Sequence, residues 1–356
     1  MRGAVDAAFR HQQHADAWLT TEHITLGLRR LTRLGVTCTD DVSRLPCHAA
    51  VNTSDSTQSA ISPPKRLNEK QVRSFVENGY LCVPGLLGTD ELAELKTDLN
   101  RIARGHYPSA TLKPLPADVS DADALENILF ISQPHTVSPV IRKYIAHPEV
   151  CGVLSQITAA HLPFWDGSVK CVQSTLFVKP PLFQGQAWHQ DELFIPTRDR
   201  SLIGAWVAID DATVENGCLY VIPKSHRSGY LYPQRPHDDP DEFDATPECY
   251  GFDESAEIPL EVTAGTVVFW NGYLLHRSRR NRSSGYRRVL VNHYMNAWSL
   301  LPMSPTDGER VAIADRRKII PVAGVDPYAW KGIEIGKDEI WLGTTKANTP
   351  QRDEHA

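Results

Sequence analysis

The sequence predicts a mainly β fold with flanking helices, of the antiparallel double-sheet kind that includes the jelly roll. Two segments with helical spacing of apolar residues lie between residues 67 and 103. From residue 170 onward the pattern changes to short apolar runs bounded by Gly, Pro, Asn or Asp. The predicted helices come first, and many short, irregularly connected strands follow them. This order favours packed antiparallel sheets over a parallel sheet with alternating helices.

One domain with two extensions is expected. The chain has 356 residues, 41% of them hydrophobic, and can bury a substantial core. Residues 1–66 lack a core pattern and end in the polar stretch VNTSDSTQSAISPPK, so we expect a disordered extension and linker there. We place the jelly-roll domain at 67–315 and a partly disordered C-terminal extension at 316–356.

Charge and cysteine content narrow the function classes. The net charge of -6 provides no basic field for nucleic acid or an anionic membrane, so a small-molecule substrate is the expected partner. Seven cysteines are scattered singly with no Cys-x-x-Cys pair, which predicts reduced thiols in a soluble cytoplasmic protein. No apolar run approaches the roughly 18 residues that a membrane-spanning helix needs, so membrane insertion is not expected.

The first expected elements are two helices with a short strand between them. In LNEKQVRSFVENGY, Asn68 can cap a helix together with Gln71, and Gly79 ends it. YLCVPGLL follows as a short strand. A second helix is expected from Thr89, because apolar residues recur there at spacings of three and four, namely Leu92, Leu95, Leu99 and Ile102.

Six apolar runs then predict the strands of the sheets. They are CVQSTLFVKPP, AWHQDELF, LIGAWVAIDDA, CLYVIP, GTVVFW and RRVLVNHYM. Asn216 and Gly217, between the third and the fourth run, suit a tight hairpin turn. The stretch PHDDPDEFDATPECYGFDESAE is strongly acidic and poor in core residues, so a surface loop or lid is expected.

A histidine and an aspartate two residues apart in AWHQDELF indicate a metal site. In a regular strand, His189 and Asp191 share one face. With 14 histidines and 43 acidic residues, a His-x-Asp or His-x-Glu pair is expected by chance about once or twice, and four occur. This pair stands within an apolar strand pattern, where a sheet face can orient both side chains.

A third ligand and a cation complete the pattern far along the chain. A catalytic non-haem iron needs two imidazoles and one carboxylate on one face. His276 follows the strand GTVVFW, and Arg287 begins a later strand. Arg287 suits the remote carboxylate of 2-oxoglutarate, because a guanidinium binds a carboxylate through two parallel hydrogen bonds. Taken singly, a satisfied core histidine and a solvated arginine are the alternative interpretation.

The sequence resembles the phytanoyl-CoA dioxygenase family of iron(II)- and 2-oxoglutarate-dependent oxygenases over about residues 67–300. The resemblance rests on ENGYLCVPGLL, VQSTLFVKPP, WHQDELF, GAWVAIDDATVENGCLYVIPKSHRSG, HRSRRN and GYRR, in the family's order and spacing. It implies a double-stranded β-helix core, the cupin-like jelly roll. It also implies that His189, Asp191 and His276 hold Fe2+, that Arg287 binds the cosubstrate 2-oxoglutarate, and that O2 is consumed.

The same resemblance assigns further residues. Trp206 and Thr175 match positions that line the cosubstrate pocket, and Gln190, which matches the family's His-Gln-Asp form, is a candidate cofactor-binding residue. His226 in VIPKSHRSG is expected in a structural turn rather than as a metal ligand. Candidate substrate contacts are Gln173, Phe177, Trp188 and His293.

The expected reaction is hydroxylation of a small molecule, with succinate and CO2 as coproducts. The carboxylate of Asp191 supports this outcome, because halogenating relatives carry a small residue there. Two rival classes stay open: a catalytically silent jelly-roll binding protein, and a zinc-dependent hydrolase, since two histidines and one carboxylate also hold zinc. The six arginines of RSRRNRSSGYRR suggest an anionic substrate such as an acyl-CoA. The favoured interpretation of these arginines is a solvated arm that balances the acidic loop.

Overall fold

A computed structural model describes residues 60–109, 112–126, 128–301, 319–329 and 340–344 of the chain. All of these residues belong to one compact unit, Gln58–Ala356. The predicted disorder of residues 1–59 and 345–356 therefore falls outside the described residues. Within the described ranges, no helix is long and apolar enough to cross a membrane.

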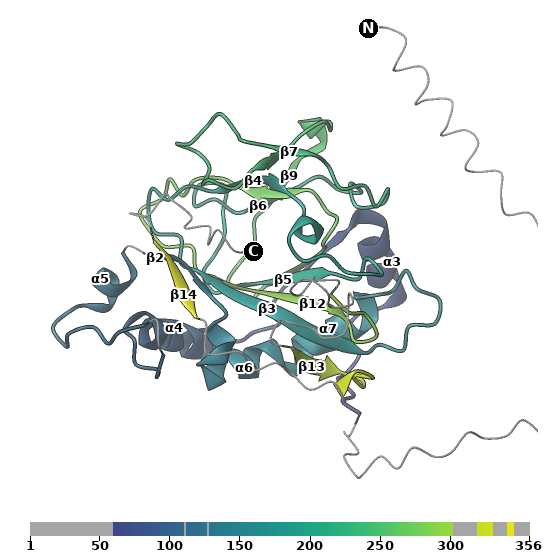
Figure 1. The fold of residues 1–356 in the computed structure, drawn as a ribbon, viewed down its shortest axis with the longest axis horizontal. Coiled ribbons are helices and arrows are strands. Elements are labelled where there is room, and N and C mark those ends of the chain that lie inside the picture. The colour runs from purple at the N-terminus through teal and green to yellow at the C-terminus, as the bar shows by residue number, and fades with distance from the viewer. Residues whose placement is uncertain (1–59, 110–111, 127, 302–318, 330–339, 345–356) are drawn as a thin grey trace, which may run out of the picture. The chain divides into compact units, whose positions relative to one another are not determined.

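Two antiparallel sheets form the predicted jelly roll (Figure 1). The larger sheet has the order β1 (Tyr80–Val83), β10 (Val267–Asn271), β5 (Ile203–Ala208), β12 (Val289–Asn296), β3 (Val169–Phe177), β2 (Ile128–Ser132) and β14 (Trp341–Thr344), with β13 (Ile320–Ala323) on β3. The smaller sheet has the order β4 (Gln186–His189), β11 (His276–Ser278), β6 (Leu219–Val221) and β9 (Ile258–Leu260). Consecutive strands from β3 to β6, and from β9 to β12, alternate between the two sheets.

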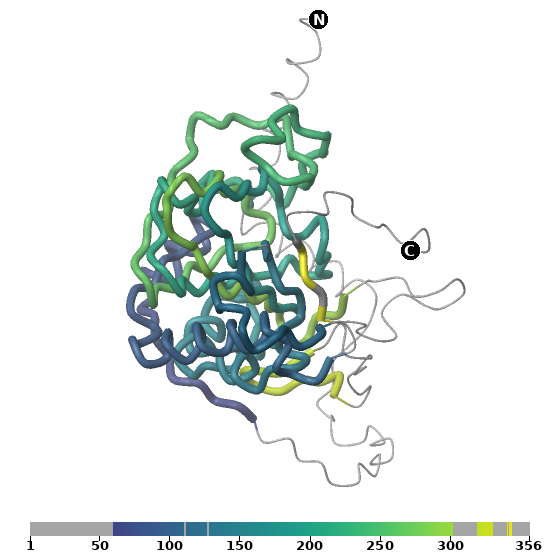
Figure 2. The backbone as a smooth tube through the Cα atoms, turned by 90° about the vertical axis from the view of Figure 1, so that its left-hand side faces the viewer, coloured from purple at the N-terminus to yellow at the C-terminus, as the bar shows by residue number. Residues whose placement is uncertain are grey.

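Helices cover the outer face of the larger sheet, opposite the smaller sheet (Figures 1 and 2). They are α4 (Thr89–Ala103), α6 (Pro139–Ile145) and α7 (Pro148–Ile157), with the short α5 (Asp121–Leu125) beside α4. Their apolar side chains share one core with Leu290 and Tyr294 of β12. Val289 and Val291 belong to a second core instead. Because successive side chains of a strand point to opposite faces, every second residue of β12 faces the space between the sheets.

The first helix begins and ends at the predicted residues. α3 (Glu69–Asn78) has Asn68 at its N-cap: the Asn68 side chain accepts a hydrogen bond from the Gln71 amide, and the Gln71 side chain accepts one from the Asn68 amide. Gly79 ends the helix with a φ of 82°, and a Cβ there would meet Nδ1 of His226 at 2.3 Å. Glycine therefore satisfies both the left-handed backbone and the close approach.

The predicted hairpin at Asn216 and Gly217 is wrong. β5 and β6 belong to different sheets, so the turn carries the chain from the larger sheet to the smaller one. The side chain of Asn216 accepts a hydrogen bond from the Thr213 amide and stabilises this connection. Hydrophobic periodicity identifies the two strands but does not say with which strand each one pairs.

The larger sheet extends beyond the predicted domain limits. β13 pairs with β3 and β14 pairs with β2, although both follow residue 315. Ile61, which lies in the stretch expected to be a linker, also forms a β-bridge with Gly324. The two segments are short and polar at their borders, so their sequences resemble tails. They pair with β3 and β2, and Val322, Ala323 and Ile340 also join the main hydrophobic core.

Replacing Asn68 by Ala should lower the free energy of unfolding by about 1 kcal/mol, because a helix N–H loses its side-chain acceptor. The matched variant Asn68→Asp keeps an acceptor and should match the unchanged protein. Urea denaturation followed by circular dichroism measures both. Equal stability of the Ala and Asp variants would contradict the capping role.

Candidate metal centre

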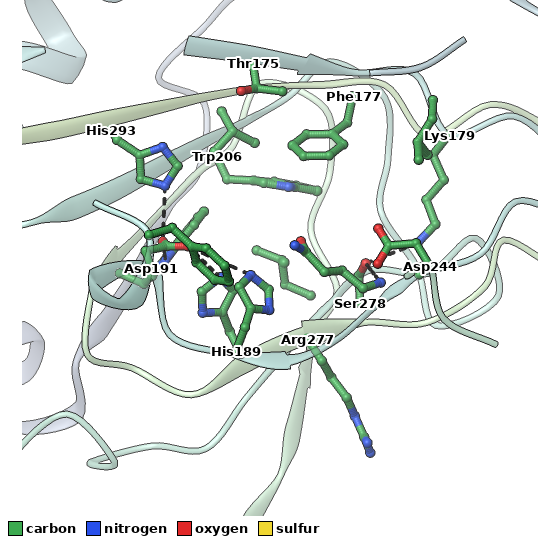
Figure 3. Close-up of a pocket in the computed structure, with 18 of the residues that line it drawn as sticks. Thr175, Phe177, Lys179, His189, Asp191, Trp206, Asp244, Arg277, Ser278 and His293 are labelled. Atoms are coloured by element: carbon green, nitrogen blue, oxygen red, sulfur yellow. Dashed lines mark hydrogen bonds and ion pairs between the residues drawn. The ribbon is translucent and has the colours of Figure 1, made fainter. Parts of the chain in front are cut away.

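A cavity of about 220 Å³ lies between the two sheets (Figure 3). Its walls come from β3, β5 and β12 of the larger sheet and from β4 and β11 of the smaller sheet. His189 and Asp191 lie at one end of the drawn cavity, and Lys179 and Asp244 lie at the other (Figure 3). Side chains from distant parts of the sequence thus converge on one space.

His189, Asp191 and His276 meet at one end of this cavity. β4 and β11 pair with His189 directly opposite His276, which brings the ring centroids to 4.1 Å. Gln190 keeps an extended backbone (φ -129°, ψ 129°), so Asp191 returns to the same side as His189 before the turn Asp191–Leu193 begins. One potential ligand atom from each of the three residues lies within 4.8 Å of the others.

The hydrogen bonds of the two histidines leave their Nε2 atoms free. Nδ1 of His189 lies 2.8 Å from the Ala187 carbonyl, and Nδ1 of His276 lies 2.9 Å from the Leu274 carbonyl. Each Nδ1 therefore carries the proton and donates it, which leaves the Nε2 lone pair for a metal ion. Oδ1 of Asp191 lies 3.8 Å and 3.6 Å from these two Nε2 atoms.

The protonation states also suit a cation. Burial, and then the neighbouring His276, lower the pKa of His189 to about 4. Burial alone would raise the pKa of Asp191, but His276 and His293 hold it well below its usual range. The group thus presents a neutral His189 imidazole and an ionised Asp191 carboxylate at neutral pH, with the Nε2 atom of His276 beside them. This donor set fits a non-haem iron(II) ion.

Arg287 lies on the other wall of the cavity with its charge unpaired. The residue is 4% exposed, and its guanidinium lies 5.4 Å from the centre of the Trp206 ring. Among the described residues, no carboxylate lies within salt-bridge distance of Arg287, and its Nε has no hydrogen-bond partner. Burial lowers its pKa to about 10, so the group stays cationic at neutral pH. A buried, unpaired guanidinium is a binding site for an anion.

Lys179 is a second buried basic residue at this cavity, and its sequence position did not predict this. Its Nζ donates hydrogen bonds to the carbonyls of Gly217 and Arg279 and to the hydroxyl of Ser278. Burial, and then Arg287, hold its pKa well below the usual range. The lysine stands at the end of the quoted strand CVQSTLFVKPP, but a single lysine after a strand gives no signal of burial.

The remaining predicted residues divide into two groups. Thr175, Trp206, Gln173, Phe177 and His293 all line the cavity. Each of them lies on an inward-facing position of β3, β5 or β12, as strand alternation predicts.

Gln190 and Trp188 do not line the cavity, in contrast to the predicted contacts. The side chain of Gln190 donates to the carbonyls of Tyr230 and Tyr273 and accepts from the Tyr232 amide. The indole of Trp188 donates to Glu254. Both residues alternate with the inward-facing His189, so they point to the opposite side of β4.

Most arginines of the segment 277–288 pair with acidic residues, as the favoured interpretation predicts. Arg277 pairs with Glu254 and Glu257, and Arg282 pairs with Glu242. Glu242, Glu254 and Glu257 all belong to the acidic stretch 236–257, so this loop is held against the arginine segment. His226 contacts the Val76 carbonyl and lies apart from the metal ligands, as expected.

Fold and site together define a non-haem iron(II)- and 2-oxoglutarate-dependent oxygenase: a jelly roll with two imidazoles and a carboxylate at one cavity. The chain belongs to the phytanoyl-CoA dioxygenase (PhyH) family, whose model matches residues 75–289. The peroxisomal phytanoyl-CoA dioxygenase of Rattus norvegicus is 26% identical over 271 residues, covering 72% of this chain and 76% of the relative. Phytanoyl-CoA dioxygenase 1 of Oryza sativa subsp. japonica is 27% identical over 266 residues, covering 66% and 91%.

Solved structures support the fold. EctD from S. alaskensis with bound Fe aligns with a TM-score of 0.51 and 21% identity, covering 70% of this chain and 88% of that one. The epimerase SnoN in complex with Fe3+ and alpha ketoglutarate aligns with a TM-score of 0.51 and 18% identity, covering 72% and 96%. At these identities the likeness establishes the jelly-roll fold.

Arg287→Met should raise the free energy of unfolding of the metal-free protein by about 1–3 kcal/mol, because it removes a buried charge that has no partner. The matched variant Arg288→Met should lower it, since Arg288 binds Asp210 through hydrogen bonds of 2.7 and 2.8 Å. Urea denaturation of both variants without metal or cosubstrate measures the contrast. A loss of stability in both would show that Arg287 has a partner within the protein.

Proposed function

We propose that His189, Asp191 and His276 hold Fe2+, that Arg287 binds the remote carboxylate of 2-oxoglutarate, and that the enzyme hydroxylates a small molecule. One observation carries this proposal: an unpaired, buried guanidinium lies on the same cavity as the three candidate ligands. A zinc-dependent hydrolase has no use for such a group. A silent binding protein does not need a complete ligand set.

When bound, iron(II) would supply the oxidising chemistry, in which 2-oxoglutarate and O2 are consumed, succinate and CO2 are formed, and the substrate is oxidised. The protein holds and orients these groups. Trp206 packs against the guanidinium of Arg287 and fixes its direction. Lys179 lies near the same end, and the charge of Arg287 contributes, after burial, to lowering the pKa of Lys179. Phe177 and Phe194 contribute apolar surface to the cavity lining.

For the substrate, we propose a small molecule recognised by hydrogen bonds rather than by a cluster of arginines. Gln184 and Gln186 line the cavity; their Nε2 atoms donate to the Pro240 carbonyl and the Thr246 hydroxyl, and their amide oxygens can accept hydrogen bonds. Arg277, which also lines it, is occupied by its two salt bridges. The hypothesis of an anionic substrate such as an acyl-CoA therefore draws no support from the arginine segment.

Anaerobic titration with Fe2+ and 2-oxoglutarate should produce the visible charge-transfer band of a chelated keto acid. Asp191→Ala and His276→Ala should each abolish this band and the formation of succinate, because two ligands do not hold the ion at its working geometry. A band of full intensity in both variants would rule out the ligand assignment.

The same anaerobic titration with Fe2+ and 2-oxoglutarate tests the variant Arg287→Met. This variant should still bind Fe2+, while its affinity for 2-oxoglutarate should fall by about 100-fold, equivalent to a charge-assisted pair of roughly 3 kcal/mol. Unchanged affinity for 2-oxoglutarate would exclude Arg287 from the cosubstrate site.

A further inference from the structure

Two nitrogen atoms contact the same oxygen of Asp191. The indole Nε1 of Trp270 lies 2.7 Å from Oδ2, and Nε2 of His293 lies 3.1 Å from it. Trp270, His293 and Asp191 are 3%, 7% and 7% exposed, so water does not compete for these contacts. An indole nitrogen can only donate a hydrogen bond, so Asp191 is the acceptor.

The second contact is also a donor to Asp191. Nδ1 of His293 is buried and has no hydrogen-bond partner within the described residues. A buried N–H without an acceptor is rarer and costlier than a buried lone pair, so the ring proton belongs on Nε2. There it is donated to Asp191, and both acceptor positions of Oδ2 are then occupied.

Oδ1 is the oxygen that remains free, and it faces the two imidazoles. It lies 3.8 Å from Nε2 of His189 and 3.6 Å from Nε2 of His276. On the basis of the proposed function, we propose that Trp270 and His293 are positioning residues that restrict Asp191 to binding the iron through Oδ1 alone.

This restriction matters for the number of open positions on the ion. If iron(II) were bound with six ligands, three side chains that each used one atom would leave three positions for the keto acid and O2. A carboxylate that bound through both oxygens would occupy one of these three. The two hydrogen bonds to Oδ2 therefore keep the cosubstrate and O2 from competing for the same position.

The larger sheet is built to admit the indole. Gly204 of β5 pairs with Trp270 of β10, and a Cβ at residue 204 would meet Cε2 of the indole at 2.2 Å. The absence of a side chain at Gly204 thus gives the ring its place. The same ring packs on His276 with its centroid 5.0 Å away, so Trp270 contacts two of the three candidate ligands.

The test measures Fe2+ affinity by anaerobic titration at saturating 2-oxoglutarate, with the charge-transfer band as the signal. Trp270→Phe keeps an aromatic ring but removes the donor, and should raise the Kd for Fe2+ by about 10- to 100-fold, the usual effect of losing such a supporting contact. The matched control is Trp298→Phe, which removes an indole hydrogen bond to Asp166 at the surface. The control should leave the Kd unchanged.

Two variants at His293 separate donation from packing. His293→Leu removes the donor and should weaken Fe2+ binding as Trp270→Phe does. His293→Gln places an amide N–H near the former Nε2 and should restore most of the affinity. Gly204→Ala should also raise the Kd, because it displaces the indole without altering either donor.

The outcomes are distinct. If Trp270→Phe and His293→Leu bind Fe2+ as tightly as the unchanged protein, the positioning role is overturned. Equal weakening by His293→Leu and His293→Gln would overturn it as well, since packing alone would then explain the loss. If Trp270→Phe does not fold, the comparison of His293→Leu with His293→Gln still tests the positioning role. Failure of the unchanged protein to show the band would refute the proposed function instead.

Discussion

The pairing of β4 with β11 is the constraint on which the site depends. It sets His189 opposite His276, and the two strands come from parts of the chain separated by the whole acidic loop. Because side chains alternate along a strand, a slip of one residue in either strand would turn the imidazole of that strand out of the cavity. The irregularity in this ladder falls after His276, between it and Ser278, so the histidines themselves are held in regular register.

Charge pairing explains why the acidic loop and the arginine segment occur together. Each segment alone is electrostatically unfavourable, because charges of the same sign repel one another within a short stretch. Their salt bridges hold the loop across one side of the cavity, where Asp244 joins the lining. Arg287 is different because it lies two residues before β12, on the cavity wall, where no carboxylate of the described residues forms a salt bridge with it. Its charge is thereby left for a ligand.

The sequence was sufficient for features that depend on local spacing. The caps of α3, the strand segments and the inward direction of His189 and Asp191 all follow from short-range periodicity. It was insufficient for features that depend on which strands pair in a sheet. The role of Trp270 depends on Gly204 in another strand, and Lys179 is buried only because two loops close over it. The wrong hairpin at Gly217 has the same cause, since periodicity does not assign a strand to a sheet.

The charges of the cavity explain how it can hold its ligands without a large electrostatic cost. Asp191 carries one negative charge and Arg287 one positive charge, both groups are buried, and Lys179 and Asp244 also line the same cavity. Iron(II) and 2-oxoglutarate carry equal and opposite charges, so loading both together leaves the net charge of the cavity unchanged. Loading the iron alone would add two positive charges to a buried space that already holds Arg287, and loading the cosubstrate alone would add two negative charges beside Asp191. Because isolated buried charge is costly, the two are expected to bind with positive coupling.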